Sequence, residues 1–140
     1  MCIRDRVGLL VNGCFILGMP GDTIESMEET IEFAKELNPD TAQFYPYMVY
    51  PGTEAYEWAK KNGYLLTEDY SRWLDGNGKM VTTVSRPDLP AELVMKMCQK
   101  AVREFYIRKN YITYKAAQIS RDPMEAIRTL KSARIFFRNL

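Results

Sequence analysis

The spacing of hydrophobic residues divides the first half of the chain into four elements. Residues 9–17 form an almost continuous apolar run, which is typical of a strand covered on both faces. In residues 24–37 apolar side chains recur every three or four positions, with glutamates between them, which predicts an amphipathic helix. A second strand is predicted over residues 41–48, followed by a short helix over 53–62. This order predicts two βα units with parallel strands.

Turn residues follow both predicted strands. Gly18-Met19-Pro20-Gly21 ends the first strand, and Tyr50-Pro51-Gly52-Thr53 follows the second. Asp22 or Thr23 is expected to cap the first helix, with Glu25, three residues after Asp22, completing a capping box. Since parallel strands have their carboxyl ends at one edge of the sheet, both turns are expected at the edge where α/β proteins bind ligands.

Strand alternation separates polar from apolar side chains. Asn12, Cys14, Ile16 and Gly18 share one face of the first strand; Gln43, Tyr45 and Tyr47 share one face of the second. The helices need apolar partners, so we expect the faces with Asn12 and Gln43 to line a lumen or cleft. There the polar groups either contact a ligand or satisfy one another inside a packed barrel.

The second half of the chain has a different pattern. Residues 64–90 are irregular, with a short strand expected over Met80–Val84. A long helix is predicted from Ala91 to about Asn110, and two shorter helices over about 111–120 and 123–140. We therefore divide the chain into an α/β part over residues 7–63, a connecting segment over 64–90 and a helical extension over 91–140.

The first six residues fit nothing that follows them. They look like translated adaptor sequence, so we regard residues 1–6 as a non-native tail. The remaining chain then begins inside a strand, which indicates a truncated gene.

Composition excludes several kinds of site. The chain has no histidine, which excludes Ser-His-Asp and Cys-His catalysis and histidine metal sites. The cysteines, Cys2, Cys14 and Cys98, are too far apart for a zinc, redox or cluster-binding motif. We expect reduced thiols in a cytoplasmic protein, and we assign no catalytic and no metal-ligating residue.

Charge is distributed unevenly along the chain. From Lys96 onward the chain contains 11 Lys and Arg residues and 3 Asp and Glu residues, a net charge of +8, whereas the preceding part has a net charge of −7. This basic part suggests a noncatalytic module that binds a partner or an anionic membrane surface. The alternative is helices that pack on their own domain and keep their basic residues solvated. Nucleic acid is disfavoured, because no aromatic RNP segment or GXXG loop accompanies the charge.

Several motifs in series carry a family resemblance. Residues 11–23, Thr30–Ala34, Gln43-Phe44 and Tyr50–Thr53 together resemble the second half of a radical S-adenosylmethionine enzyme. Residues 103–112 resemble the segment that follows the barrel in the cobalamin-binding branch of that superfamily. The resemblance implies an α/β fold in which residues 7–63 are the last two βα units of a partial (β/α)6 barrel, followed by a mainly α-helical extension.

The resemblance also implies cofactors and site residues. In the superfamily a 4Fe–4S cluster cleaves S-adenosylmethionine, and the resulting 5′-deoxyadenosyl radical abstracts hydrogen from the substrate. The family's Gly-x-Ile-x-Gly motif matches Cys14-x-Ile16-x-Gly18, with Cys14 where the pattern has glycine. Ile16 would then pack on the adenine and Gly18 would let backbone approach it, while Tyr47 and Met48 would contact adenine through their backbone. Candidates on the substrate side are Asn12, Gln43 and Tyr45.

The cluster-binding Cys-x3-Cys-x2-Cys loop of the superfamily is not present in this sequence. We therefore expect the chain to be a C-terminal fragment that binds no cofactor and is inactive alone. Its partners would be the upstream half of the same polypeptide and a small, lipidic or tetrapyrrole-like organic substrate, with peripheral membrane contact as a further expectation. The related radical methylthiotransferases are an alternative, but they end in a β-barrel RNA-binding domain, whereas a helical end is predicted here.

Overall fold

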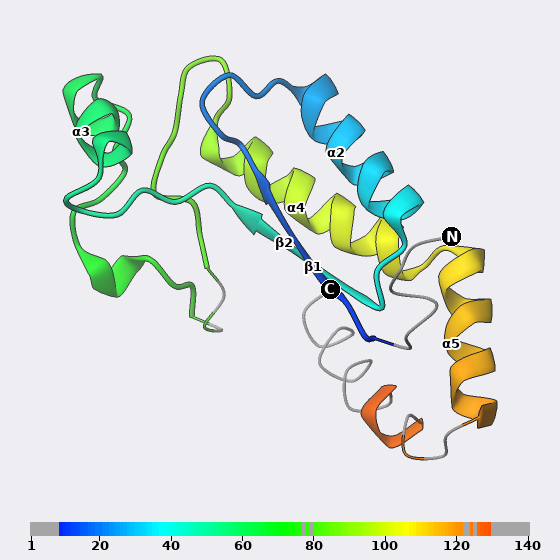
Figure 1. Cartoon of the computed structure of the whole chain (residues 1–140). Helices are drawn as coiled ribbons and strands as arrows, with labels where there is room; N and C mark the ends of the chain where they lie inside the picture. Colours follow the sequence, from blue (N-terminus) through cyan, green and yellow to red (C-terminus); the bar gives the residue numbers. More distant parts are fainter. Residues whose placement is uncertain (1–8, 77, 79, 122–123, 125, 130–140) are drawn as a thin grey trace. The chain divides into compact units, whose positions relative to one another are not determined.

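The computed structural model describes residues 9–76, 78, 80–121, 124 and 126–129. The elements, in chain order, are β1 (Asn12–Leu17), α2 (Ile24–Leu37), β2 (Thr41–Pro46), α3 (Glu54–Lys61), the 3₁₀ helix η1 (Tyr70–Arg72), α4 (Ala91–Tyr106) and α5 (Lys109–Arg121) (Figure 1). The predicted tail over residues 1–6 and most of the helix predicted over 123–140 lie outside the described residues.

The two strands form a parallel sheet, as predicted. The register pairs Asn12 with Thr41 at one end and Leu17 with Pro46 at the other. Both strands are shorter than predicted. At the start of β1, the N–H of Val11 donates to Oδ2 of Asp40 at 2.8 Å instead of joining a longer ladder.

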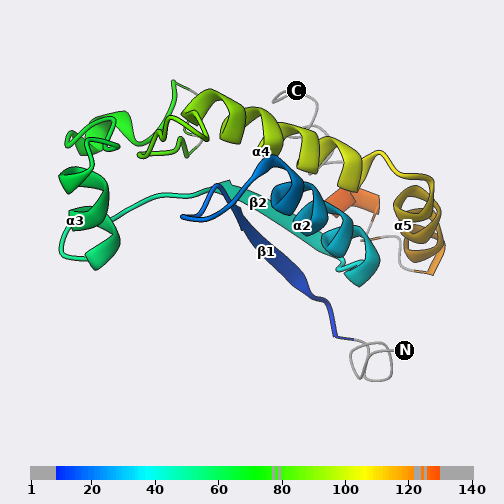
Figure 2. The same ribbon diagram turned by 90° about the horizontal axis from the view of Figure 1, so that it is seen from above.

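The sheet has one covered and one exposed face. Leu17, Ala42 and Phe44 are buried on the covered face, where the rings of Phe15 and Phe44 stack with centroids 5.2 Å apart. Helices α2 and α4 lie on this side of the strands (Figure 2). Apolar residues from both helices are buried there: Met27, Ile31, Ala34, Val94, Met97, Cys98 and Ala101. The predicted separation of polar and apolar strand faces is therefore present.

The start of α2 differs from the prediction. Thr23 is the N-cap, and its hydroxyl accepts a hydrogen bond from the N–H of Ser26 at 3.2 Å. Ser26 returns the contact, because its hydroxyl accepts from the N–H of Thr23 at 3.0 Å. The predicted box between Asp22 and Glu25 is wrong, because a cap at Thr23 puts Ser26 at the third helical position.

Residues 64–90 form no regular strand in the described part of the chain. The strand predicted over Met80–Val84 is wrong; among the described residues of this segment, two isolated antiparallel bridges occur instead, Leu65 with Val84 and Leu74 with Met80. A hydrophobic cluster of Val49, Tyr56, Ala59 and Val84 instead holds this segment against α3. The side-chain hydroxyls of Thr82 and Thr83 form hydrogen bonds with the backbone after β2 and so replace part of a strand ladder.

The chain divides into two compact units inside α4, the first ending at Val102 and the second beginning at Arg103. In the second unit α4 ends at Tyr106, so the helix predicted to about Asn110 is too long. The break lets the ring of Tyr111 contact Phe105, 5.3 Å between centroids, a pair that would lie on different faces of one straight helix. No helix in the described parts of the chain is long and apolar enough to cross a membrane.

Candidate functional site

The carboxyl edge of the sheet is formed by the two turns predicted from the sequence. The N–H of Tyr47 donates to the carbonyl of Leu17 at 2.8 Å and so extends the strand pairing to this edge. The Gly18–Thr23 turn begins here on β1, and residues 47–53 leave β2. The α/β part therefore has the geometry at which parallel sheets commonly bind ligands.

The carboxylate of Asp22 organises the first turn. Its Oδ2 accepts hydrogen bonds from the N–H groups of Gly18 and Met19, at 2.9 and 2.8 Å. Its Oδ1 accepts from the hydroxyl of Ser26 at 3.3 Å. Asp22 is thus the residue that closes the turn, rather than the helix cap that the sequence suggested as one alternative.

A buried arginine from the connecting segment clamps the same turn. The guanidinium of Arg86 donates to the carbonyls of Met19 and Asp22, at 2.8 and 2.9 Å. Arg86 is 7% exposed and also pairs with Asp88 at 3.1 Å. Its rigid planar fork suits two carbonyls held side by side. The turn is therefore fixed by a residue more than 60 positions further along the chain.

Gly18 is required by packing. Its φ is +87°, and a Cβ on it would lie 2.8 Å from Cγ1 of Val94 on α4. The space beside Gly18 is thus filled by the protein itself. The expectation that Gly18 admits a cofactor remains a prediction, while its contact with α4 is a structural reason for glycine at this position.

After β2, the backbone N–H and C=O of one residue, Met48, make no hydrogen bond within the described part of the chain. The carbonyl of Tyr47 accepts from the Thr82 hydroxyl at 2.7 Å, and the N–H of Val49 donates to Oγ1 of Thr83 at 3.0 Å. Within the described residues, neither the N–H nor the C=O of Met48 has a hydrogen-bond partner. Of the two residues predicted to contact adenine, Met48 therefore keeps its backbone groups available, whereas both groups of Tyr47 are engaged. Partial burial raises the pKa of the Tyr47 phenol.

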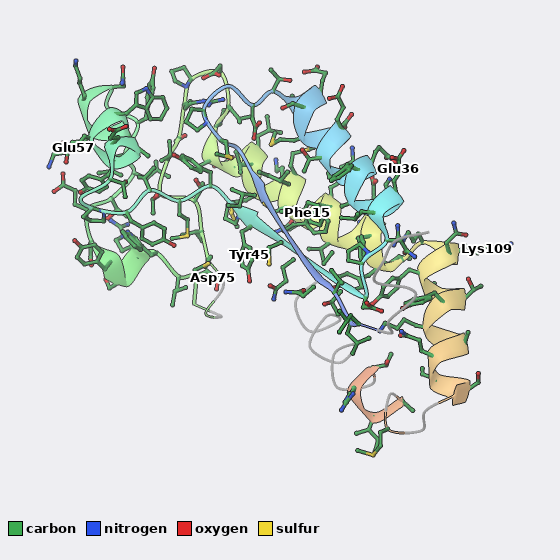
Figure 3. The ribbon with its side chains drawn as sticks, viewed as in Figure 1. Phe15, Glu36, Tyr45, Glu57, Asp75 and Lys109 are labelled. Atoms are coloured by element: carbon green, nitrogen blue, oxygen red, sulfur yellow. The ribbon has the colours of Figure 1, made fainter. Side chains whose placement is uncertain are left out.

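The remaining predicted residues lie on the exposed face. Ile16 is 51% exposed and pairs in register with Tyr45, which is half-buried. Cys14 pairs with Gln43, and both are exposed. Figure 3 labels Tyr45 on this face and Phe15 on the opposite, covered one. The structure thus brings Asn12, Cys14, Ile16, Gln43 and Tyr45 onto one surface.

Polar side chains on this surface bond to one another. The hydroxyl of Thr41 donates to Oδ1 of Asn12 at 2.8 Å, and Nδ2 of Asn12 donates to Oε1 of Gln43 at 3.2 Å. The thiol of Cys14 donates to the same Oε1 at 3.6 Å. The polar groups therefore satisfy one another in part, on a face of the sheet that is exposed.

A metal centre is not supported by the described residues. They contain no group of three or more His, Cys, Asp or Glu side chains that could hold a metal ion. Cys14 lies exposed on the sheet, whereas Cys98 is buried on α4, and burial raises the pKa of the Cys98 thiol to about 12. These two thiols do not fit the ligand set of an iron–sulfur cluster.

Sequence reasoning missed the residues that hold the edge in place. Arg86, Thr82 and Thr83 lie in a segment without regular periodicity, so no pattern marks their partners. Asp22 was visible as an acidic residue before a helix, yet that position suggests a cap and not a contact back to the turn.

Comparison with known proteins finds three informative relatives. An uncharacterized methyltransferase of Pyrococcus horikoshii is 37% identical over 103 residues, 74% of this chain and 22% of the relative. The ribosomal protein uS12 methylthiotransferase of Leptospira biflexa is 36% identical over 70 residues, 49% of this chain and 15% of the relative. The anaerobic magnesium-protoporphyrin IX monomethyl ester cyclase of Rubrivivax gelatinosus is 25% identical over 114 residues, 80% of this chain and 19% of the relative.

The chain spans about a fifth or less of the length of these curated relatives. No family model and no solved structure matches it.

Proposed function

Because the chain is homologous to these enzymes, which belong to the radical S-adenosylmethionine superfamily, we propose that it is part of such an enzyme. In this proposal β1, α2, β2 and α3 are the last two βα units of a partial (β/α)6 barrel. The helices from α4 onward form an extension after it. The parallel sheet with both turns at its carboxyl edge supports this assignment.

The adenosyl part of S-adenosylmethionine is assigned to the carboxyl edge. The observation that carries this assignment is that, among the described residues, neither the backbone N–H nor the backbone C=O of Met48 has a hydrogen-bond partner. The adjoining carbonyl of Tyr47 and N–H of Val49 are both engaged. Adenine presents both donors and acceptors at its edge, so it can pair with an N–H and a C=O of one residue. Ile16 supplies an exposed apolar surface on the neighbouring strand. The family resemblance adds Gly18 and Tyr47 to the proposed cofactor-binding set, although Val94 fills the space beside Gly18 and both backbone groups of Tyr47 are engaged.

The iron–sulfur cluster is assigned to no residue of this chain. In the full-length enzyme the cluster would supply the electron that cleaves S-adenosylmethionine, and the described thiols do not fit it. We accordingly expect the 140-residue chain alone to bind no cluster and to be inactive. Its partners in the proposal are the remainder of the same polypeptide and a small organic substrate.

The substrate is proposed to be lipidic or tetrapyrrole-like, with cobalamin as an additional cofactor of the full-length enzyme. The match to the cyclase supports this branch over a methylthiotransferase. It covers 80% of the 140 residues and so must include residues 103–112, whereas a match that covers 49% need not. The methylthiotransferase alternative predicts an RNA- or protein-modifying activity instead.

The test is anaerobic reconstitution of the full-length gene product with iron, sulfide, a reductant and S-adenosylmethionine. We expect 5′-deoxyadenosine to form, and no product from the 140-residue chain under the same conditions. Ile16→Asn should weaken binding of S-adenosylmethionine about tenfold, because it removes apolar surface from the adenine site. Leu37→Asn is the matched control, since Leu37 is 43% exposed at the end of α2, far from the Gly18–Thr23 turn. Equal losses in both variants would contradict the assignment of Ile16.

The noncatalytic alternative, a membrane-surface module, is tested separately. In the second unit Ile107 and Ile112 are 51% and 54% exposed, close in sequence to Lys109. A membrane module would sediment with anionic vesicles at low salt and be released at high salt. The enzyme proposal requires no such binding, so a chain that stays in the supernatant at low salt contradicts only the membrane module.

A further inference from the structure

The exposed face of the sheet carries a hydrogen-bond network that leaves the amide nitrogen of Gln43 unused. We propose that this face selects substrates with a hydrogen-bond acceptor, a carbonyl or carboxylate oxygen, and that Nε2 of Gln43 is the selecting donor. The inference rests on the proposed function, because the exposed face contacts substrate only if it lines the reaction chamber of the enzyme.

The network gives the amide of Gln43 a defined orientation. Oδ1 of Asn12 accepts from Thr41 at 2.8 Å, so the amide of Asn12 presents its Nδ2 to its other neighbours. Nδ2 donates to Oε1 of Gln43 at 3.2 Å and to Sγ of Cys14 at 3.6 Å. Since Oε1 of Gln43 also accepts from Cys14, the oxygen end of this amide is occupied twice.

The amide nitrogen of Gln43 is not used by this network. Within the described residues, Nε2 of Gln43 has no acceptor, and the hydroxyl of Tyr45 has no partner. Gln43 and Tyr45 are two residues apart on one face of β2, about 7 Å along the strand. The face therefore offers two hydrogen-bonding groups next to the apolar side chain of Ile16.

The network also changes the role of Asn12. All its side-chain hydrogen-bonding groups contact neighbouring residues, so it has no N–H left for a ligand. Asn12 is a positioning residue that acts through Gln43, and Thr41 in turn orients Asn12. No side chain of the six on this face, Asn12, Cys14, Ile16, Thr41, Gln43 and Tyr45, carries a formal charge in its ordinary state, so selection depends on hydrogen bonding and not on an ion pair.

The test compares two probes of similar size and opposite hydrogen-bonding capacity, benzoate and benzylammonium. Calorimetric titration of the reconstituted full-length protein should show tighter binding of benzoate. Gln43→Glu replaces the donor by an anionic acceptor, so benzoate affinity should fall about tenfold or more and the preference should reverse. Gln99→Glu, the same change at an exposed position of α4, should leave the preference unchanged.

Substitutions of Thr41 distinguish a role in positioning Gln43 from a purely structural role. Thr41→Val removes the hydroxyl that orients Asn12, and we expect a benzoate affinity about three- to tenfold lower without reversal; Thr41→Ser should restore it. The inference is overturned if wild-type protein prefers benzylammonium, or if the Gln43 and Gln99 variants behave alike. Formation of 5′-deoxyadenosine in the same preparations reports on the proposed function independently: its absence refutes that function, whereas its presence without probe selectivity refutes only the role of Gln43.

Discussion

Gly18 and Val94 are in such close contact that a single added carbon atom would collide. A Cβ on Gly18 would lie 2.8 Å from Cγ1 and 2.9 Å from Cγ2 of Val94. Gly18 directly follows β1 and Val94 lies on α4, so this contact sets how closely the helix approaches the carboxyl edge. The approach of α4 therefore depends on the absence of a side chain in the turn.

Gly18→Ala is expected to destabilise the protein through two effects. The positive φ costs about 1 kcal/mol for a residue with a Cβ, and the clash with Val94 adds about 1–3 kcal/mol. Gly21→Ala is the matched control, because Gly21 has a φ of +92° and nothing within 4 Å of its ideal Cβ. Urea unfolding should give a clearly larger loss for Gly18, and Val94→Ala should reduce the difference in a double-mutant cycle. Equal losses at both glycines would show that Val94 can move aside.

Arg86→Met is expected to loosen the Gly18–Thr23 turn. It removes charged donors from the carbonyls of Met19 and Asp22, a loss of about 2–4 kcal/mol of stability. Hydrogen exchange of the Gly18 and Met19 amides should accelerate, because Asp22 loses its fixed position.

The exposed partner of Arg86 provides the control. Asp88 has a side chain 70% exposed, so Asp88→Asn should change stability by no more than about 0.5 kcal/mol. A comparable effect of the two substitutions would mean that the ion pair, and not the carbonyl contacts, holds Arg86.

Met48→Pro is expected to weaken S-adenosylmethionine binding by the full-length enzyme about three- to tenfold. Proline has no N–H, so one of the two free backbone groups is lost. Met48→Leu keeps both backbone groups and should bind normally. Thermal unfolding of both variants must match wild type for the comparison to hold, and weak binding by Met48→Leu would indicate a side-chain role instead.

Cys98 is expected to make the protein less stable in alkali. Its pKa is raised by burial from 9.0 to about 12, so the neutral thiol is favoured in the folded state. Below pH 9 the thiol is neutral in both states, so its ionisation does not change the free energy of unfolding. Between pH 9 and about 12 the unfolded chain loses this proton while the folded protein keeps it, and stability falls by about 1.4 kcal/mol per pH unit.

The measurement for Cys98 is urea unfolding at several alkaline pH values, compared with Cys98→Ala. The variant should be less stable at neutral pH and should lose stability less steeply above pH 9. Parallel pH profiles would contradict the assignment. Iodoacetamide at neutral pH should modify exposed Cys14 well before Cys98.

Much of the α/β part could be predicted from the sequence. The spacing of Met27, Ile31 and Ala34 predicted the buried face of α2, and strand alternation predicted the polar surface around Asn12 and Gln43. These features depend on local periodicity, which is written into neighbouring residues. The strand expected over Met80–Val84 failed, because Thr82 and Thr83 use their hydroxyls on the chain after β2.

By itself the sequence determined that two strands lie parallel with their turns at one edge, and that polar groups share one face. The family resemblance likewise needed only the order of the motifs. Tertiary structure alone decided which of these groups remain available. Arg86, Thr82 and Val94 reach the edge from distant positions and occupy the turn, the Tyr47 carbonyl and the space beside Gly18. Such contacts join residues remote in sequence, so no local pattern encodes them, and they leave Met48 and Gln43 as the groups open to a ligand.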